Sequence, residues 1–256
     1  MRTIILVVFV GLFAFSGYKI FSIVKEEQQS KQIINDLQEK AVIENRYDEG
    51  KVSEQGAAKE TSIEKAEDQC PISVNFDVLK EECQDIVAWI YCPDTPVNYP
   101  IVQGPDNQFY LRRMTNGEYN NAGTLFMDFR NEEDFTDKNT IIYGHNMKND
   151  TMFGSLPMYE EQEYYDKHPV MYLLTAEKNY KIELFSSFIT SADSDIYSLP
   201  TEENNFEAHI SDLRENSDFK SNVSIEHGDG IVTLSTCSYE YDVARRVVIG
   251  VLKEIG

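Results

Sequence analysis

The chain has 256 residues, of which 41% are hydrophobic and 26% charged, so it can build a packed core and is not expected to be disordered. It carries 44 acidic and 23 basic residues, and the net charge of −21 argues against nucleic acid as a partner, because a phosphate backbone calls for basic patches. Four cysteines in this length exclude a scaffold built on disulfides. The length allows one main domain with accessory segments.

The N-terminal segment Thr3–Val24 is the most apolar part of the sequence. It contains no charge before Lys19, and a helix of about 20 apolar residues can span a bilayer. The segment could be a cleaved signal peptide or a retained transmembrane anchor, and we favour the anchor because no small-x-small cleavage site follows it. Arg2 and the α-amine precede it. The positive-inside rule therefore predicts a short cytoplasmic tail, residues 1–2, with residues 25–256 on the outer side.

Residues 25–70 are polar and carry only a partial helical stripe of apolar side chains, which fades after Gly50. We interpret this segment as a polar stalk, helical at first and then flexible, that carries a domain of residues 71–256. The alternative is that the first part of the segment packs on the domain.

From Pro71 onward, short β-rich runs alternate with turn residues such as Pro93-Asp94 and Asn116-Gly117. This texture predicts a mainly β domain, a barrel or a sandwich, with added helices. The predicted strands are residues 86–91, 97–102, 123–128, 139–144, 170–174, 179–186, 230–236 and 246–252. The predicted helices are residues 76–84, 155–166 and 203–217.

The stretch Gly230–Leu252 is the most informative part of the chain. A β-rich run ends at Cys237, and a second run begins at Arg245 after a mostly polar connection. Two such runs most simply pair antiparallel, which brings Cys237 and Arg245 to the same end of the pair. Because side chains alternate along a strand, only one of Arg245 and Arg246 can join Cys237, and periodicity alone does not choose between them.

A histidine stands at the end of another apolar run. Ile141–Tyr143 is followed by Gly144 and then His145, which is the kind of strand-end loop where functional sites commonly form. Cysteine attacks as the thiolate, which a nearby imidazolium and guanidinium would stabilise. Histidine can then protonate a leaving amine, and arginine offers a fixed fork of donors to a developing oxyanion. Cysteine, histidine and arginine together therefore suit acyl transfer.

The motifs TLSTC at 233–237 and YGHNM at 143–147, with an arginine eight residues beyond the cysteine, resemble those of sortases, and specifically of class B. The resemblance covers nearly all of residues 72–254, and the apolar N-terminal segment is also typical of the family. Three further segments support it: VAWIYCPDTPVNYPIVQGPDNQFYL at 87–111, AGTLFMDFRN at 122–131 and MFGSLPMYEE at 152–161.

The resemblance implies an eight-stranded β-barrel with N-terminal helices and a further helix in the long connection before the Cys-bearing strand, where residues 203–217 fit. It also implies a cysteine transpeptidase that cleaves a C-terminal sorting signal of secreted proteins after Thr, without a metal or other cofactor. The thioacyl enzyme would pass the acyl group to an amine of a cell-wall precursor or to a pilin lysine. The enzyme would be a single-pass protein of a Gram-positive cell membrane, with its catalytic domain extracellular.

The resemblance also assigns roles to residues. Cys237 would be the nucleophile, His145 the acid and base, and Arg245 the group that stabilises the oxyanion, because the family's spacing favours Arg245 over Arg246. Four residues resemble positions of the substrate groove: Asn107, Leu111, Tyr143 and Ser235. The exact sorting motif and the acceptor amine stay open.

Two other classes of protein also stay open. One is another cell-wall enzyme with a cysteine nucleophile. However, an L,D-transpeptidase would be expected to carry Gly where Thr236 precedes the cysteine, and a papain-like peptidase would place its cysteine before its histidine. The other is a membrane-tethered binding module without catalysis, which the presence of all three reactive side chains disfavours.

The other three cysteines and one acidic run are the remaining features of the sequence. Outside the cell, two of Cys70, Cys83 and Cys92 could form a disulfide, whereas a nucleophilic Cys237 must stay free. The acidic run 128–137 lacks the spacing of an EF-hand calcium loop, so we expect a solvated loop there.

Overall fold

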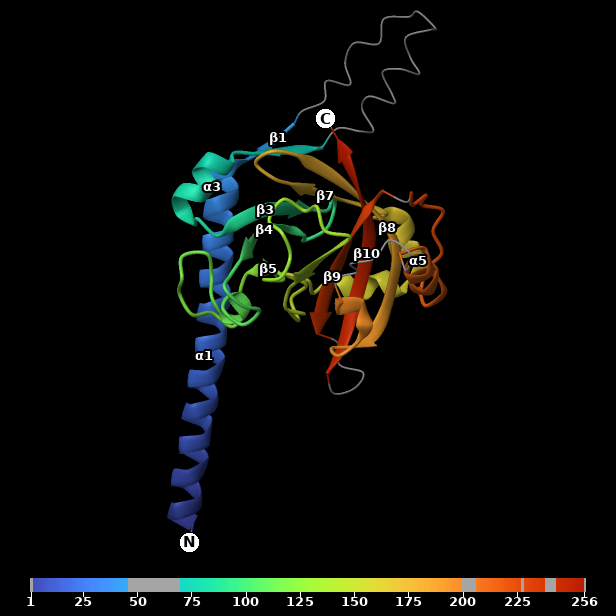
Figure 1. Ribbon diagram of the computed structural model, residues 1–256. Helices are drawn as coiled ribbons and strands as arrows, with labels where there is room; N and C mark the ends of the chain where they lie inside the picture. Colours follow the sequence, from blue (N-terminus) through green and yellow to red (C-terminus); the bar gives the residue numbers. More distant parts are fainter. Residues whose placement is uncertain (1, 46–69, 199–205, 227, 238–242, 256) are drawn as a thin grey trace, which may run out of the picture.

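The computed structural model describes residues 2–45, 70–198, 206–226, 228–237 and 243–255, with side chains from residue 11 onward and at Phe9. Its centre is a closed barrel of eight strands in the order β10-β8-β7-β3-β4-β5-β6-β9 (Figure 1). The expected eight-stranded barrel is therefore confirmed. The strands are β3 (Ile86–Tyr91), β4 (Asn98–Gln103), β5 (Leu125–Met127), β6 (Asn139–Tyr143), β7 (Val170–Leu174), β8 (Asn179–Ser191), β9 (Gly230–Cys237) and β10 (Ala244–Ile255).

Each barrel strand overlaps one of the eight runs predicted from the sequence, and the ends differ by a few residues at most strands. Strand β8 is longer than predicted because it curves along β10 as far as Ser191, past a bulge between Ile249 and Gly250. A Cβ at Gly250 would lie 2.3 Å from Cγ2 of Ile182, so glycine is required where these two strands approach closely. Within the barrel, β4 with β5 and β6 with β9 are parallel pairs, and the other pairs are antiparallel.

Three hydrophobic clusters hold the domain together. The largest fills the barrel with wholly buried side chains such as Ile101, Leu173 and Leu234. A second lies outside the barrel wall around Trp89, and a third lies under a helix of the β8–β9 connection. Aliphatic side chains of this kind contribute roughly 1.5–3 kcal/mol each when fully buried. The rim loops that carry polar residues are therefore supported by a rigid core.

The N-terminal helix α1 (Arg2–Ala41) runs continuously through the predicted anchor and into the predicted stalk. Its second half lies against the barrel, where Ile34, Leu37 and Ala41 are buried and the Gln38 side chain donates a hydrogen bond to Asn98 O at 2.8 Å. The interpretation of residues 25–41 as a free spacer is thus corrected in favour of the alternative. The partial apolar stripe is the face that packs on the domain.

The first half of α1 extends away from the barrel (Figure 1), and the apolar side chains described there, at Phe9 and from residue 11 onward, are mostly exposed, with 84% exposure at Phe13. Among the residues described, no helix combines the length and apolarity that crossing a membrane requires. Most of the remaining stalk, residues 46–69, lies outside the described residues. The domain boundary at residue 71 stays a prediction.

The smaller elements surround the barrel. Strand β1 (Val42–Glu44) follows α1 directly and pairs antiparallel with strand β2 (Ile72–Val74). The sequence did not predict these two short strands. The predicted helix 76–84 is α3 (Phe76–Glu82). The predicted helix 155–166 is divided into a 3-10 helix η2 (Leu156–Glu160) and α4 (Gln162–Lys167), because Glu161 between them is extended.

The connection from β8 to β9 contains a 3-10 helix η3 (Asp195–Tyr197) and the helix α5 (Phe206–Glu215). The expected helix in the long connection before the Cys-bearing strand is therefore present, although residues 203–205 of the predicted range lie outside the described residues. Another 3-10 helix, η1 (Tyr110–Arg112), precedes β5.

Candidate active site

The end of strand β9 places the cysteine. In the antiparallel pairing of β9 with β10, Cys237 lies opposite Arg245. In the parallel pairing of β6 with β9, Tyr143 lies opposite Ser235, so His145 follows two residues after its strand at the level of Cys237. Because side chains alternate along a strand, Ser235 and Cys237 share a face of β9. The ends of β6 and β9 and the start of β10 therefore meet at one rim of the barrel.

A cavity of about 530 Å³ lies at this rim. All seven residues singled out from the sequence line it: Asn107, Leu111, Tyr143, His145, Ser235, Cys237 and Arg245. The side of the cavity formed by η3 and its flanks was not predicted and contributes residues from Ala192 to Ser198. The cavity is large enough for a peptide side chain or two beside the thiol, and the roles of its residues stay predictions.

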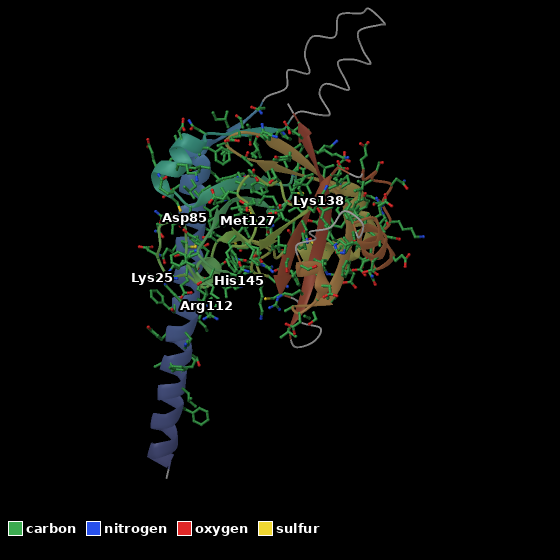
Figure 2. All side chains as sticks on the ribbon, viewed as in Figure 1. Lys25, Asp85, Arg112, Met127, Lys138 and His145 are labelled. Atoms are coloured by element: carbon green, nitrogen blue, oxygen red, sulfur yellow. The ribbon has the colours of Figure 1, made fainter. Side chains whose placement is uncertain are left out.

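Two hydrogen bonds fix the position of His145 and the loop that carries it. Nε2–H of His145 donates to the carbonyl oxygen of Leu111 at 2.7 Å, beside η1 and its labelled residue Arg112 (Figure 2). Asn146 donates from its side chain to the carbonyl oxygen of Cys237 at 2.9 Å, which ties the histidine loop to the end of β9. Because a carbonyl oxygen only accepts, this contact places the proton of the neutral ring on Nε2 and leaves Nδ1 as its acceptor nitrogen.

Gly144 allows the chain to turn from β6 into the histidine loop. Its N–H donates to Ser235 O at 3.0 Å, which continues the pairing with β9 by one residue. A Cβ at this position would lie 2.4 Å from Cδ2 of Leu125 and 2.6 Å from Cδ2 of Phe153. Since both neighbours belong to the packed core, only glycine fits without displacing them.

Arg246 has a different environment from its neighbour Arg245. Its side chain is only 2% exposed and forms ion pairs with Asp218 and, at 3.4 Å, with Glu160. Only Arg245 lines the cavity, where one guanidinium nitrogen donates to its neighbour's carbonyl, Ala244 O, at 2.9 Å. The structure thus selects Arg245 as the arginine that faces Cys237, the choice that strand periodicity had left open.

The other three cysteines are buried, and no disulfide links the four, all of which are described. Burial raises the pKa of Cys70 to about 11 and also raises the pKa of Cys92, so these thiols are protonated at neutral pH. Cys237 is partly exposed at the cavity. It is therefore the cysteine that a substrate can reach.

Sequence reasoning missed a polar cluster beside the cavity, centred on Asp128. The expectation of a solvated loop is wrong at this residue, because the Asp128 side chain is wholly buried. It accepts hydrogen bonds at 2.8 Å from Nε and Nη2 of Arg130, at 2.9 Å from Asn107 and at 3.1 Å from Tyr143. Arg130 in turn donates to Tyr197 O at 3.0 Å. The signal that could have revealed it is an Asp-x-Arg sequence that begins at the last residue of the predicted strand 123–128.

Known proteins are similar to this chain over most of its length. Residues 90–253 match the family model described as a sortase domain. The chain is 34% identical to Sortase B of Listeria monocytogenes and 29% identical to Sortase B of Staphylococcus aureus. Each alignment covers 96% of this chain and 94% of the relative.

Two solved structures share the fold of this chain. A substrate complex of Staphylococcus aureus sortase B superposes with a TM-score of 0.73 at 28% identity, covering 91% of this chain and all of that chain. Sortase B of Bacillus anthracis, in complex with AAEK1, superposes with a TM-score of 0.72 at 31% identity, with the same two coverages. The chain belongs to the sortase family, and the resemblance to class B is confirmed. It is a sortase-type cysteine transpeptidase.

Proposed function

We propose that the protein cleaves the C-terminal sorting signal of secreted proteins after Thr and transfers the acyl group to an amine, with Cys237 as nucleophile, His145 as acid and base and Arg245 as the oxyanion-stabilising group. The observation that carries the proposal is the position of Arg245 opposite Cys237, with His145 in the same cavity. The accessible thiol of Cys237 shares its cavity with the His145 imidazole and the Arg245 guanidinium, which is an arrangement suited to a cysteine nucleophile.

In the first half of the reaction, the thiolate sulfur of Cys237 attacks the carbonyl carbon of the Thr residue. The S–C bond forms, and the carbonyl oxygen becomes an oxyanion beside the Arg245 guanidinium. When the tetrahedral intermediate collapses, the Thr–X amide bond breaks, and the leaving amine takes a proton from His145 through Nδ1. A thioester on Cys237 and a free C-terminal fragment result.

In the second half, an acceptor amine attacks the thioester carbonyl. A new amide bond forms, the S–C bond breaks, and Cys237 leaves as the thiolate. The proton lost by the amine passes to His145, which restores the starting state. The acceptor that we propose is an amine of a cell-wall precursor or a pilin lysine.

We further propose that the segment Thr3–Val24 anchors the enzyme in the cell membrane of a Gram-positive cell with the catalytic domain outside. Support comes from the apolar sequence of the segment and from the exposed apolar side chains of the described part, such as Phe13 and Phe21. Deletion of residues 2–24 should move the protein from the membrane fraction to the soluble fraction when the cells are lysed and fractionated. Retention in the membrane fraction would contradict the anchor.

The catalytic proposal is tested with a panel of peptides carrying Asn-Pro-x-Thr or Ser/Pro-Pro-x-Thr-Gly signals, incubated with and without an added amine. We expect cleavage after Thr and, with the amine present, a ligated product. Cys237→Ala and His145→Ala should each abolish both products while the circular dichroism spectrum is unchanged. Normal turnover by either variant would contradict the assigned roles.

A further inference from the structure

The η3 side of the cavity is held to the barrel through Tyr197. Its hydroxyl lies 2.8 Å from Oγ of Ser235, and its ring stacks on Tyr143 at a centroid distance of 6.1 Å. A third contact reaches the backbone, where Nη2 of Arg130 donates to Tyr197 O at 3.0 Å. The side chain of Asn139 also donates to Ile196 O at 2.9 Å. These polar contacts join this wall of the cavity to the barrel, in addition to the packing of buried Ile196 in the third hydrophobic cluster.

Arg130 is oriented for its contact with η3 by Asp128. Nε and Nη2 of Arg130 each lie 2.8 Å from a different carboxylate oxygen of Asp128, which is the bidentate fork geometry of a strong charge-assisted pair. The same Nη2 makes the bond to Tyr197 O. One guanidinium nitrogen therefore bridges the barrel loop and η3, and the carboxylate fixes its direction.

Asp128 is in turn fixed on the barrel side. Its backbone N–H donates to Ile141 O at 2.9 Å, and its carbonyl accepts a hydrogen bond from the Gln103 side chain at 3.0 Å. Its burial alone would raise the pKa of its carboxyl. The hydrogen bonds and charge of Arg130, with the hydrogen bond from Asn107, outweigh this effect and hold the pKa below its ordinary value. The anchor of the Arg130 fork is thus a charged, immobile carboxylate at neutral pH.

We infer that Arg130 is a positioning residue that holds η3 against the barrel and so sets the shape of the groove in which the sorting signal lies. We call the contact from Asp128 through Arg130 to Tyr197 O the latch. Asp128 acts through Arg130 and through the groove residues Asn107 and Tyr143. The inference rests on the proposed function for its substrate, but the latch itself is a property of the fold. A loosened wall should weaken peptide binding more than it slows the chemistry at the sulfur.

Only arginine can make this bridge. A lysine at position 130 could keep a charge near Asp128, but it has a single nitrogen and cannot make the paired contacts and the bond to Tyr197 O in one fixed plane. Arg130→Lys should therefore behave like Arg130→Ala in the groove while retaining much of the ion pair. Arg112→Ala is the matched control, because Arg112 is exposed and does not line the cavity.

The latch is measured first by amide hydrogen exchange of the full-length protein. The N–H groups of Tyr197 and Ser198 are bonded within η3, to Ser194 O and Asp195 O. In Arg130→Ala and Arg130→Lys we expect at least about fivefold faster exchange in residues 192–198, with unchanged exchange in β9 and β10. Unchanged exchange of 192–198 in both variants would overturn the inference.

The consequence for the substrate is measured by kinetics on the best sorting peptide. We expect both Arg130 variants and Asp128→Asn to raise KM by about tenfold, in line with losing a hydrogen bond to a charged group, with kcat within about threefold of wild type. The rate of Cys237 alkylation by iodoacetamide should not change in the Arg130 variants. A fall in kcat at unchanged KM would contradict a role in the groove.

Failure of the inference can be distinguished from failure of the proposed function. If the wild-type protein cleaves none of the sorting peptides, the proposed function fails, and exchange of residues 192–198 still decides whether the latch exists. If the wild type is active and Arg112→Ala raises KM as much as Arg130→Ala does, the effect belongs to general surface charge, and the inference is overturned.

Discussion

Arg245 on β10 lies directly opposite Cys237 on β9, whereas its neighbour Arg246 is buried on the other face of the same strand. The two arginines are thus neighbours in sequence but lie on opposite faces of β10. Arg245 reaches the cavity where an oxyanion would form, and Arg246 joins β10 to Asp218 and Glu160 outside it. Register, rather than sequence position alone, decides which arginine can serve the reaction.

Replacing Arg245 should therefore affect catalysis, and replacing Arg246 should affect stability. We expect Arg245→Ala to lower kcat by at least ~10²-fold, as for loss of one oxyanion donor, with little change in the denaturant midpoint. Arg246→Ala should keep kcat within a few-fold but lower the free energy of unfolding by about 1–3 kcal/mol, because Asp218 loses its partner. The reverse pattern in kinetics and urea unfolding would show that the face assignment is wrong.

Gly144→Ala should disturb the histidine loop. The added methyl would meet Leu125 and Phe153, and we expect a cost of about 1–3 kcal/mol in unfolding free energy. Because His145 is the next residue, a displacement near 1 Å should also lower kcat/KM by at least about tenfold. Gly228→Ala is the matched control, since its Cβ would meet nothing within 4 Å. Equal behaviour of the two variants would contradict this account of the loop.

The packing of α1 on the barrel predicts that Leu37 stabilises the catalytic domain. Its side chain is 4% exposed within the cluster around Trp89, so Leu37→Ala should lower the free energy of unfolding by about 2–5 kcal/mol. Glu39→Ala, at an exposed position of the same helix, should change it by less than about 0.5 kcal/mol. Chemical denaturation measures both, and an unaffected Leu37→Ala variant would restore the free-spacer interpretation.

Most of the fold could be predicted from the sequence, because each barrel strand is a short β-rich run bounded by turn residues. The docking of α1 could not, because its apolar stripe is incomplete and only the barrel surface shows that Ile34 and Leu37 have a partner. Local pattern likewise cannot reveal the parallel pairing of β6 with β9, which joins residues about ninety positions apart. That pairing is what brings His145 to Cys237.

The motifs predicted the residues that line the candidate site, but they did not predict the residues that hold these in place. Asp128 and Arg130 lie in an acidic run that resembles a solvated loop, and only the fold shows that Asp128 is buried and that Arg130 reaches Tyr197. Arg246 was a candidate for the cavity until the register of β10 placed it on the opposite face. Contacts between residues far apart in the sequence determine both the burial of Asp128 and the face on which Arg246 lies.

The stability of the domain should fall in mild acid because of His209 on α5. Burial lowers the pKa of this imidazole, and Asp212 offsets the effect only in part. The folded state thus binds a proton less readily than the unfolded state, whose histidine titrates near 6.5, so stability is lost as the pH falls from about 6.5 through the lower folded pKa. His209→Gln should show a shallower fall of melting temperature between pH 7 and pH 5. An identical slope in wild type and variant would contradict this role.

Intact-protein mass spectrometry during turnover of a sorting peptide without added amine shows directly whether Cys237 carries the acyl group. We expect a covalent adduct with the mass of the peptide acyl group through Thr, mapped to Cys237 and released by hydroxylamine, and none in Cys237→Ala. Cleavage of the peptide with no adduct on Cys237, or with an adduct on another residue, would contradict the claim that this sulfur carries the acyl group.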